Sequence, residues 1–86
     1  MLTETEKALS DIKNILDGGK SIFLPLTVGT NVGEATALFF DGRGMTYLKN
    51  DRSVFREVAN TLSNDPRYTI EIKLDGSCEN YTLKKA

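Results

Sequence analysis

The sequence has no histidine and no tryptophan, and its only cysteine is Cys78. The lack of histidine removes the commonest general base near neutral pH and the commonest transition-metal ligand. A structural zinc site needs several cysteines or histidines, and an internal disulfide needs a second cysteine. We therefore predict no metal, no cofactor and no catalytic residue, and we interpret Cys78 as a small strand residue.

The chain also lacks a strong net charge and a long apolar run. Its 86 residues include 11 basic and 12 acidic side chains, which give a net charge of −1. Neither half is strongly basic, so the electrostatic signature of a duplex-DNA binder is missing. No apolar run approaches the roughly 20 residues that span a bilayer, and the first residues are acidic where a signal peptide would be basic. These features predict one small domain, residues 1–86, in the cytoplasm.

One segment approaches a phosphate-binding loop without completing it. The stretch TVGTNVGEA, residues 27–35, follows an apolar run that is typical of a strand. A Walker A loop needs Lys and then Ser or Thr after its second glycine, because the lysine must reach the phosphates. Here Glu34 follows Gly33 and would repel a phosphate. We predict a strand-to-strand connection in which the glycines take positive φ angles.

Two amphipathic helices are predicted. The first runs from Thr3, which has the capping-box spacing to Glu6, to Asp17, and the pair Gly18–Gly19 ends it. The second follows the possible caps Asn50, Asp51 and Ser53 and ends at Asn64-Asp65-Pro66. Its apolar stripe has helical spacing and consists of Val54, Phe55, Val58, Ala59 and Leu62.

Alternating side chains and turn residues predict five strands. In the first, Ser21–Val28, Pro25 lacks an N–H and favours an edge strand or a bulge. The turn Asp41–Gly44 joins the second and third strands, Glu34–Phe40 and Met45–Lys49, and places Phe40 opposite Met45 and Leu38 opposite Tyr47. In the last hairpin the Asp75-Gly76 turn predicts pairing of Leu74 with Ser77 and of Ile70 with Tyr81, followed by a frayed tail, residues 84–86.

The predicted fold is therefore a small α+β domain with the order α-β-β-β-α-β-β. Two helices cannot easily cover both faces of so small a sheet, so we expect an antiparallel-rich sheet with both helices on one face.

An uncovered sheet face would be the natural place for a binding site. Phe39 and Phe40 are neighbours on one strand, so their side chains point to opposite faces. We expect Phe23, Phe40, Phe55 and Tyr68 in the core. Phe39, with Leu48 and Ala37, is either exposed on the uncovered face or buried inside the monomer, and burial is the simpler expectation. The predicted partner-binding residues are Phe39, Leu48, Asp41, Arg43 and Tyr47. The first strand, Ser21–Val28, is a further candidate as an exposed edge.

The remaining candidate is a small basic patch. Arg52 and Arg56 are four residues apart on the second helix, and Lys49 precedes them. Basic side chains beside aromatic residues can bind single-stranded nucleic acid by stacking. Asp51 and Glu57 interrupt the patch, and a solvated helix face is its simpler explanation.

From sequence, the favoured function is a non-catalytic protein-binding module. Small regulators and inhibitors of the phage or mobile-element type have this size and composition, and they act by occupying a partner's surface. A nucleic-acid binder that uses Lys49, Arg52 and Arg56 is one alternative, and a structural homodimer is another. An enzyme is the weakest hypothesis, because it would need paired carboxylates in a cleft.

Overall fold

The computed structural model describes residues 3–86 and has the predicted element order. Two helices and five strands follow the order α-β-β-β-α-β-β. Their bounds are α1 Glu4–Asp17, β1 Ile22–Thr27, β2 Glu34–Phe40, β3 Met45–Asp51, α2 Arg52–Ser63, β4 Tyr68–Asp75 and β5 Cys78–Lys85. Among the described residues, no helix is long and apolar enough to cross a membrane.

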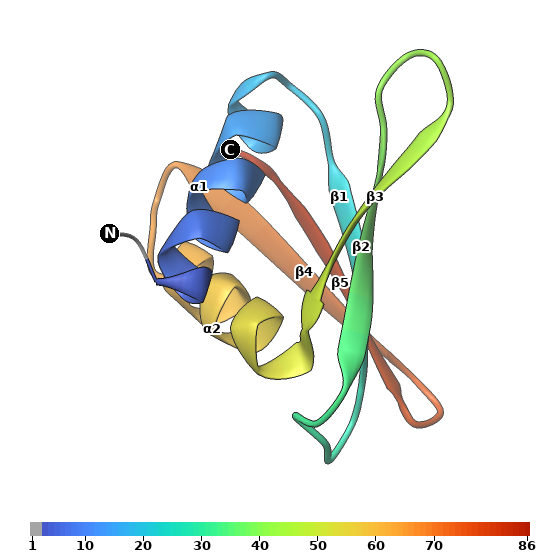
Figure 1. The fold of residues 1–86 in the computed structure, drawn as a ribbon. Helices are drawn as coiled ribbons and strands as arrows, with labels where there is room; N and C mark the ends of the chain where they lie inside the picture. The colour runs from blue at the N-terminus through green and yellow to red at the C-terminus, as the bar shows by residue number, and fades with distance from the viewer. Residues whose placement is uncertain (1–2) are drawn as a thin grey trace.

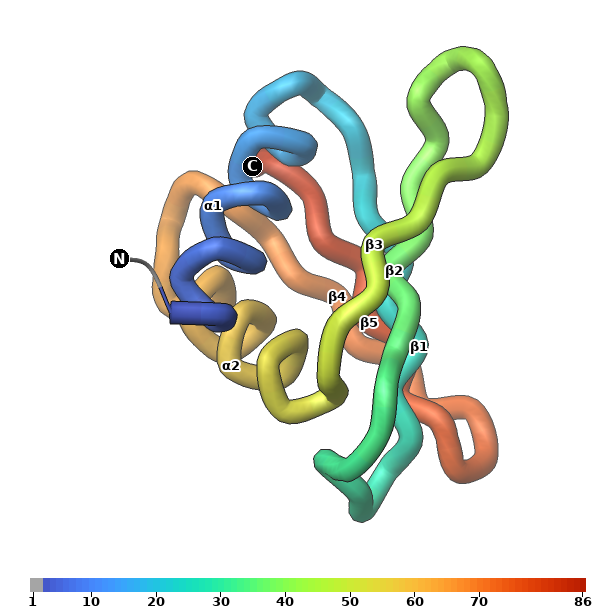
Figure 2. Tube along the Cα trace, viewed as in Figure 1, coloured from blue at the N-terminus to red at the C-terminus, as the bar shows by residue number. Residues whose placement is uncertain are grey.

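The strands form one antiparallel sheet in the order β3-β2-β1-β5-β4. Figure 1 shows α1 and α2 side by side against one face of this sheet, while no helix covers the other face. The trace in Figure 2 shows the β2–β3 and β4–β5 hairpins projecting beyond the helical layer at opposite ends. The prediction of an α+β fold with both helices on one face is confirmed.

Local signals define the first helix as predicted. Thr3 caps α1, because its side chain accepts a hydrogen bond from Glu6 N while the Glu6 carboxylate accepts one from Thr3 N. Ala8, Ile12 and Leu16 form the buried stripe. Gly19, at φ 87°, lets the chain leave the helix and turn into β1.

The second helix has its predicted apolar stripe but not its predicted cap. All five stripe residues are buried. Asp51 occupies the N-cap position, yet its side chain makes no capping hydrogen bond. Instead the carbonyl of Gly33, in the β1–β2 connection, accepts a hydrogen bond of 2.9 Å from Arg52 N. A tertiary contact thus satisfies a backbone donor that local side chains usually satisfy.

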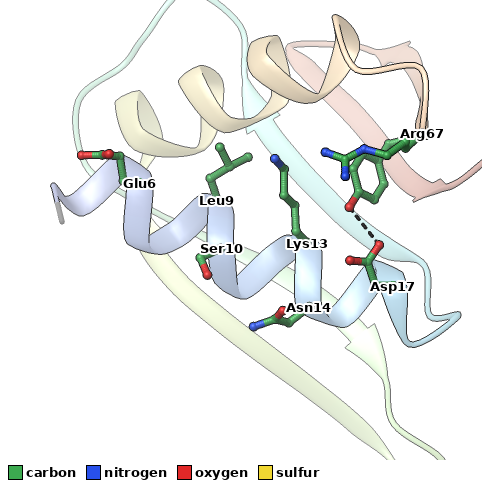
Figure 3. A pocket seen from close by; sticks show the side chains of 8 residues that line it. Glu6, Leu9, Ser10, Lys13, Asn14, Asp17 and Arg67 are labelled. Atoms are coloured by element: carbon green, nitrogen blue, oxygen red, sulfur yellow. Dashed lines mark hydrogen bonds between the residues drawn. The ribbon is translucent and has the colours of Figure 1, made fainter.

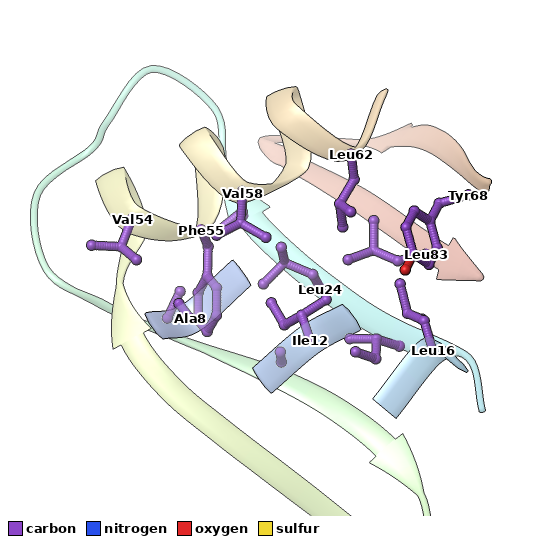
Figure 4. Close-up of a cluster of buried hydrophobic side chains, with 14 residues drawn as sticks. Ala8, Ile12, Leu16, Leu24, Val54, Phe55, Val58, Leu62, Tyr68 and Leu83 are labelled. Carbon is purple, nitrogen blue, oxygen red and sulfur yellow. The ribbon is translucent and has the colours of Figure 1, made fainter. Parts of the chain in front are cut away.

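The core lies between the two helices and the covered face of the sheet (Figure 4). Alternate residues of β1, Ile22, Leu24 and Leu26, are fully buried there, and Leu83 of β5 lies opposite Ile22. Among the described residues, no polar or charged residue is buried. The core therefore owes its stability to apolar burial and packing.

The expectation that β1 is an edge strand is wrong. β1 lies at the centre of the sheet, between β2 and β5. It pairs with β5 along its whole length, but its register with β2 covers only Ile22 and Phe23. Because Val28 N bonds to Ser77 O, even-numbered residues of β1 direct their N–H toward β5. The nitrogen of Pro25 therefore points to the β2 side of the strand. The β1–β2 ladder has already ended there, so the missing N–H of Pro25 costs the sheet no hydrogen bond.

One hairpin register is confirmed and the other is corrected. In β2–β3, Phe40 pairs with Met45 and Leu38 with Tyr47, as predicted. In β4–β5, Asp75 pairs with Cys78, so the two-residue loop is Gly76–Ser77 and Leu74 pairs with Glu79 rather than Ser77. Gly76, at φ 61°, supplies the geometry that the first position of such a loop requires. The two-residue shift leaves every side chain on its predicted face.

The predicted frayed tail is also wrong for its first two residues. Lys84 pairs with Thr69 and Lys85 with Tyr68. The ladder continues to the last residue, because Ala86 N donates to Arg67 O.

Candidate functional site: the uncovered face of the sheet

Of the two adjacent phenylalanines of β2, Phe40 lies on the uncovered face and not in the core as predicted, whereas Phe39 is partly buried within the monomer. Phe39 lies opposite Ile22 of β1 and packs against the core, as does Leu48 of β3, and Ala37 is fully buried. Phe40 is 62% exposed and Phe23 is 40% exposed. Pairing with the central strand decides the outcome, because Ile22 is fully buried and its neighbour Phe39 must share its face.

The uncovered face carries a continuous group of apolar side chains on three adjacent strands. Phe40 pairs with Met45, and Leu38 lies between Tyr47 of β3 and Phe23 of β1. Phe40, Met45 and Tyr47 are each more than half exposed. We call this group the aromatic face: Phe23, Leu38, Phe40, Met45 and Tyr47.

The aromatic face is hollowed as well as apolar. Four of its residues, Phe23, Leu38, Phe40 and Met45, contribute to the lining of a hollow of about 300 Å³, with Thr82 of β5 at its side. Its shape suits an apolar side chain from another molecule, because small concave apolar sites favour such groups. Sequence analysis found one of the five residues, Tyr47. The apolar residues Ile22, Leu24 and Leu26 alternate along β1 and therefore share one face. This sequence pattern would have placed Phe23 on the opposite face.

The hairpin tip beside the aromatic face is a closed turn. The Asp41 carboxylate accepts hydrogen bonds of 2.9 Å from Arg43 N and from Thr46 Oγ1. These bonds lower the pKa of Asp41, with the Arg43 N–H as the largest cause. Asp41 therefore has a structural role in shaping the tip, while Arg43 is exposed at its end.

The predicted basic residues do not form a common patch. Arg56 donates from Nη1 to Glu79 Oε1 and from Nη2 to Thr27 O, each at 2.7 Å. Arg52 donates from Nη1 to Val32 O at 2.7 Å, in the β1–β2 connection. Lys49 lies opposite Thr36, on the uncovered face. The two arginines thus connect α2 to the sheet and its loop, apart from Lys49.

Arg56 fills a gap that the sheet leaves open. Odd-numbered residues of β1 direct their carbonyls toward β2, and the β1–β2 register ends before Thr27. The guanidinium therefore bonds to the Thr27 carbonyl in place of the missing strand neighbour and neutralises half-buried Glu79.

We expect Arg56→Ala to lower the free energy of unfolding by about 1.5–3 kcal/mol, the usual value for hydrogen bonds to charged groups. The loss would be measured by urea denaturation followed by circular dichroism. Lys49→Ala is the matched control and should change stability by less than about 0.5 kcal/mol. Equal effects of the two substitutions would contradict a structural role for Arg56.

The glycines of the β1–β2 connection behave as predicted. Gly29 and Gly33 have φ angles of 83° and 95°. A Cβ on Gly33 would lie 2.7 Å from Arg52 Nη1, so a larger residue would also displace the end of the Arg52 side chain, which bonds to Val32 O. The segment that approached a phosphate-binding motif is thus a tight strand-to-strand connection.

A larger hollow lies elsewhere, between α1 and the start of β4 (Figure 3). It measures about 460 Å³, and among the side chains that line it one pair, Tyr68 and Asp17, is joined by a hydrogen bond. Tyr68 Oη donates to Asp17 Oδ1 at 2.8 Å, and burial together with this bond raises the pKa of Tyr68. Arg67 donates to Asp65 at 2.8 Å and lowers the pKa of that carboxyl to about 2. The Tyr68–Asp17 bond thus joins the start of β4 to α1, and the Arg67–Asp65 pair stabilises the α2–β4 turn.

The other candidates for chemistry are isolated. Cys78 is half-buried, and its Sγ lies 3.3 Å from Asn80 Oδ1. Within residues 3–86, no three His, Cys, Asp or Glu side chains lie close enough together to hold a metal ion. Comparison of the chain with protein-family models, curated proteins and solved structures gave no match. The aromatic face is therefore our candidate functional site, because it combines exposed apolar side chains with a hollow.

Proposed function

We propose that this protein is a non-catalytic protein-binding module that uses its aromatic face to occupy the surface of a partner protein. The observation that carries the proposal is the continuity of Phe23, Leu38, Phe40, Met45 and Tyr47 across three strands on the face that no helix covers. Exposed contiguous apolar patches on small domains mark interaction sites. A regulator or inhibitor of the phage or mobile-element type would act by this kind of occlusion.

The size of the aromatic face suits the centre of an interface. Large side chains of this kind bury roughly 150–250 Å² each, so the exposed fractions of 40% to 62% leave on the order of 400 Å² uncovered. A standard interface covers about 800 Å² per partner. The rest would come from a polar rim, for which the hairpin tip with Asp41 and Arg43 and the nearby Lys49 are placed.

The side chains present also match those that dominate binding energy. Aromatic residues and methionine are enriched in interface centres, where the surrounding contacts exclude water. The hollow of about 300 Å³ beside Phe40 would receive an apolar anchor from the partner.

We expect Phe40→Asp and Tyr47→Asp each to weaken partner binding by at least about 30-fold, since hot-spot residues contribute about 2 kcal/mol or more. The partner would first be captured from the native host with the tagged wild-type chain, and affinities would then be measured by calorimetry. Val32→Asp is the matched control, because Val32 is 81% exposed and lies outside the aromatic face.

The control should bind as the wild type does. If both aromatic-face variants kept wild-type affinity for the captured partner, the proposed function of this face would be wrong. Circular dichroism of each variant separates lost binding from lost structure.

A further inference from the structure

The outer edge of β4 is a second surface whose features the proposed function does not explain. β4 ends the sheet order, and no strand lies beyond it within residues 3–86. Ala86 N bonds to Arg67 O, and Asp75 pairs with Cys78 across a two-residue loop. Odd-numbered residues of β4 therefore direct their backbone groups to β5, and the even-numbered ones direct theirs outward. The outward set is Ile70, Ile72 and Leu74.

The same even-numbered residues leave apolar side chains exposed on the helical side of the sheet. α2 covers the start of β4, where Tyr68 is buried and Ile70 half-buried. Farther along, Ile72 is 54% and Leu74 74% exposed. Beside α2, Ile70 and Ile72 also line a hollow of about 140 Å³.

The odd-numbered residues place charges of alternating sign on the opposite face of β4. Glu71 and Lys73 are both exposed there, between Thr69 and Asp75. Charges on an edge strand usually oppose strand pairing, because most registers bring like charges together. The register of β4 with itself that is centred on Ile72 has the reverse effect.

We propose that β4 pairs antiparallel with β4 of a second copy of this chain, with Ile72 opposite Ile72. Glu71 of each copy then lies opposite Lys73 of the other, which gives an opposite-charge pair on each side of the two-fold axis. Ile70 lies opposite the second copy's Leu74, so that leucine reaches the rim of the 140 Å³ hollow. The backbone groups of Ile70, Ile72 and Leu74 already point outward to make the new hydrogen bonds.

Charge excludes the neighbouring registers. A shift of two residues in one direction places Glu71 opposite Glu71 of the second copy. A shift of two in the other direction places Lys73 opposite Lys73 and brings each Glu71 against an Asp75. Like charges directly opposite each other destabilise a strand pair. The alternation of sign along β4 thus selects the register that also brings the apolar side chains together.

The dimer would change how the aromatic face is presented. The two-fold axis runs perpendicular to the sheet, so two five-stranded sheets join into one of ten strands with both aromatic faces on the same side. A partner with two equivalent sites would then bind more tightly through multivalency.

The test reverses charge at the proposed contact. The full-length wild type, Glu71→Lys, Lys73→Glu and the double variant Glu71→Lys/Lys73→Glu would be compared by sedimentation equilibrium. Each single reversal turns both opposite-charge pairs into like-charge pairs and should weaken the dimer by about tenfold or more. The double variant restores opposite charges and should recover the wild-type dissociation constant. Both side chains are exposed, so the variants should stay folded, as circular dichroism would verify.

A different set of results would overturn the proposal. It fails if the wild type stays monomeric at concentrations up to about 1 mM, where even weak pairing is detectable. It also fails if the single reversals dimerise as the wild type does, or if the double variant does not recover. Loss of the dimer in Tyr47→Asp, with the charge reversals silent, would assign the contact to the aromatic face instead.

Discussion

Phe39→Asp is expected to lower the free energy of unfolding by at least about 3 kcal/mol, whereas Phe40→Asp, one residue along the strand, should cost less than about 1 kcal/mol. Phe39 packs against the core opposite Ile22, so the substitution removes a packed ring and places a charge beside apolar side chains. Phe40 is mostly exposed, and its replacement meets water. A domain of this size has only roughly 4–13 kcal/mol of stability, so the first variant would lose about a quarter to three quarters of it.

Urea denaturation of the two variants, followed by circular dichroism, measures this difference. The substitutions are chemically identical and adjacent in sequence, so each serves as the control for the other. Similar losses in both, or a larger loss in Phe40→Asp, would contradict the assignment of faces on which the proposed function depends.

Phe55→Ala is expected to lower the free energy of unfolding by about 3–5 kcal/mol, the usual cost of deleting a buried phenylalanine ring. Phe55 is only 1% exposed, and its ring lies between α1 and α2 beside Ala8 and Ile12 (Figure 4). The substitution would leave a cavity at the place where α2 packs against α1.

Phe23→Ala is the matched control for this substitution. Phe23 is 40% exposed on the aromatic face, so its loss should cost less than about 1.5 kcal/mol. Thermal or urea unfolding of the two alanine variants gives the comparison. A larger cost at Phe23 would mean that the aromatic face is part of the folding core.

The two proposed surfaces of this protein are separate and can be tested separately. The aromatic face lies on β1, β2 and β3, and the dimer contact lies on the outer edge of β4. Charge reversal at Glu71 or Lys73 leaves the aromatic face intact, and Phe40→Asp leaves the β4 edge intact. Partner binding and self-association should therefore respond to different variants.

The sequence predicted an apolar surface on the uncovered face of the sheet, but not which side chains form it. The sequence indicated that one of Phe39 and Phe40 must leave the core, because adjacent strand residues point to opposite faces. It did not indicate which one, because an apolar residue fits either face until a strand pairs beside it. The sequence likewise presents Arg56 only as a cation on a helix face, because its contact with Thr27 depends on where the β1–β2 ladder ends.

The sequence by itself determined both helices, the five strands, the order of these elements along the chain, the capping box at Thr3 and the pairing of Phe40 with Met45. These features depend on residues a few positions apart, so caps, turn residues and periodicity specify them. Only the tertiary structure decided that β1 lies at the centre of the sheet, which side chains the uncovered face presents, and which charges are paired. Those outcomes depend on burial between segments far apart in the chain, where many arrangements satisfy the same local pattern and the total apolar area removed from water selects among them.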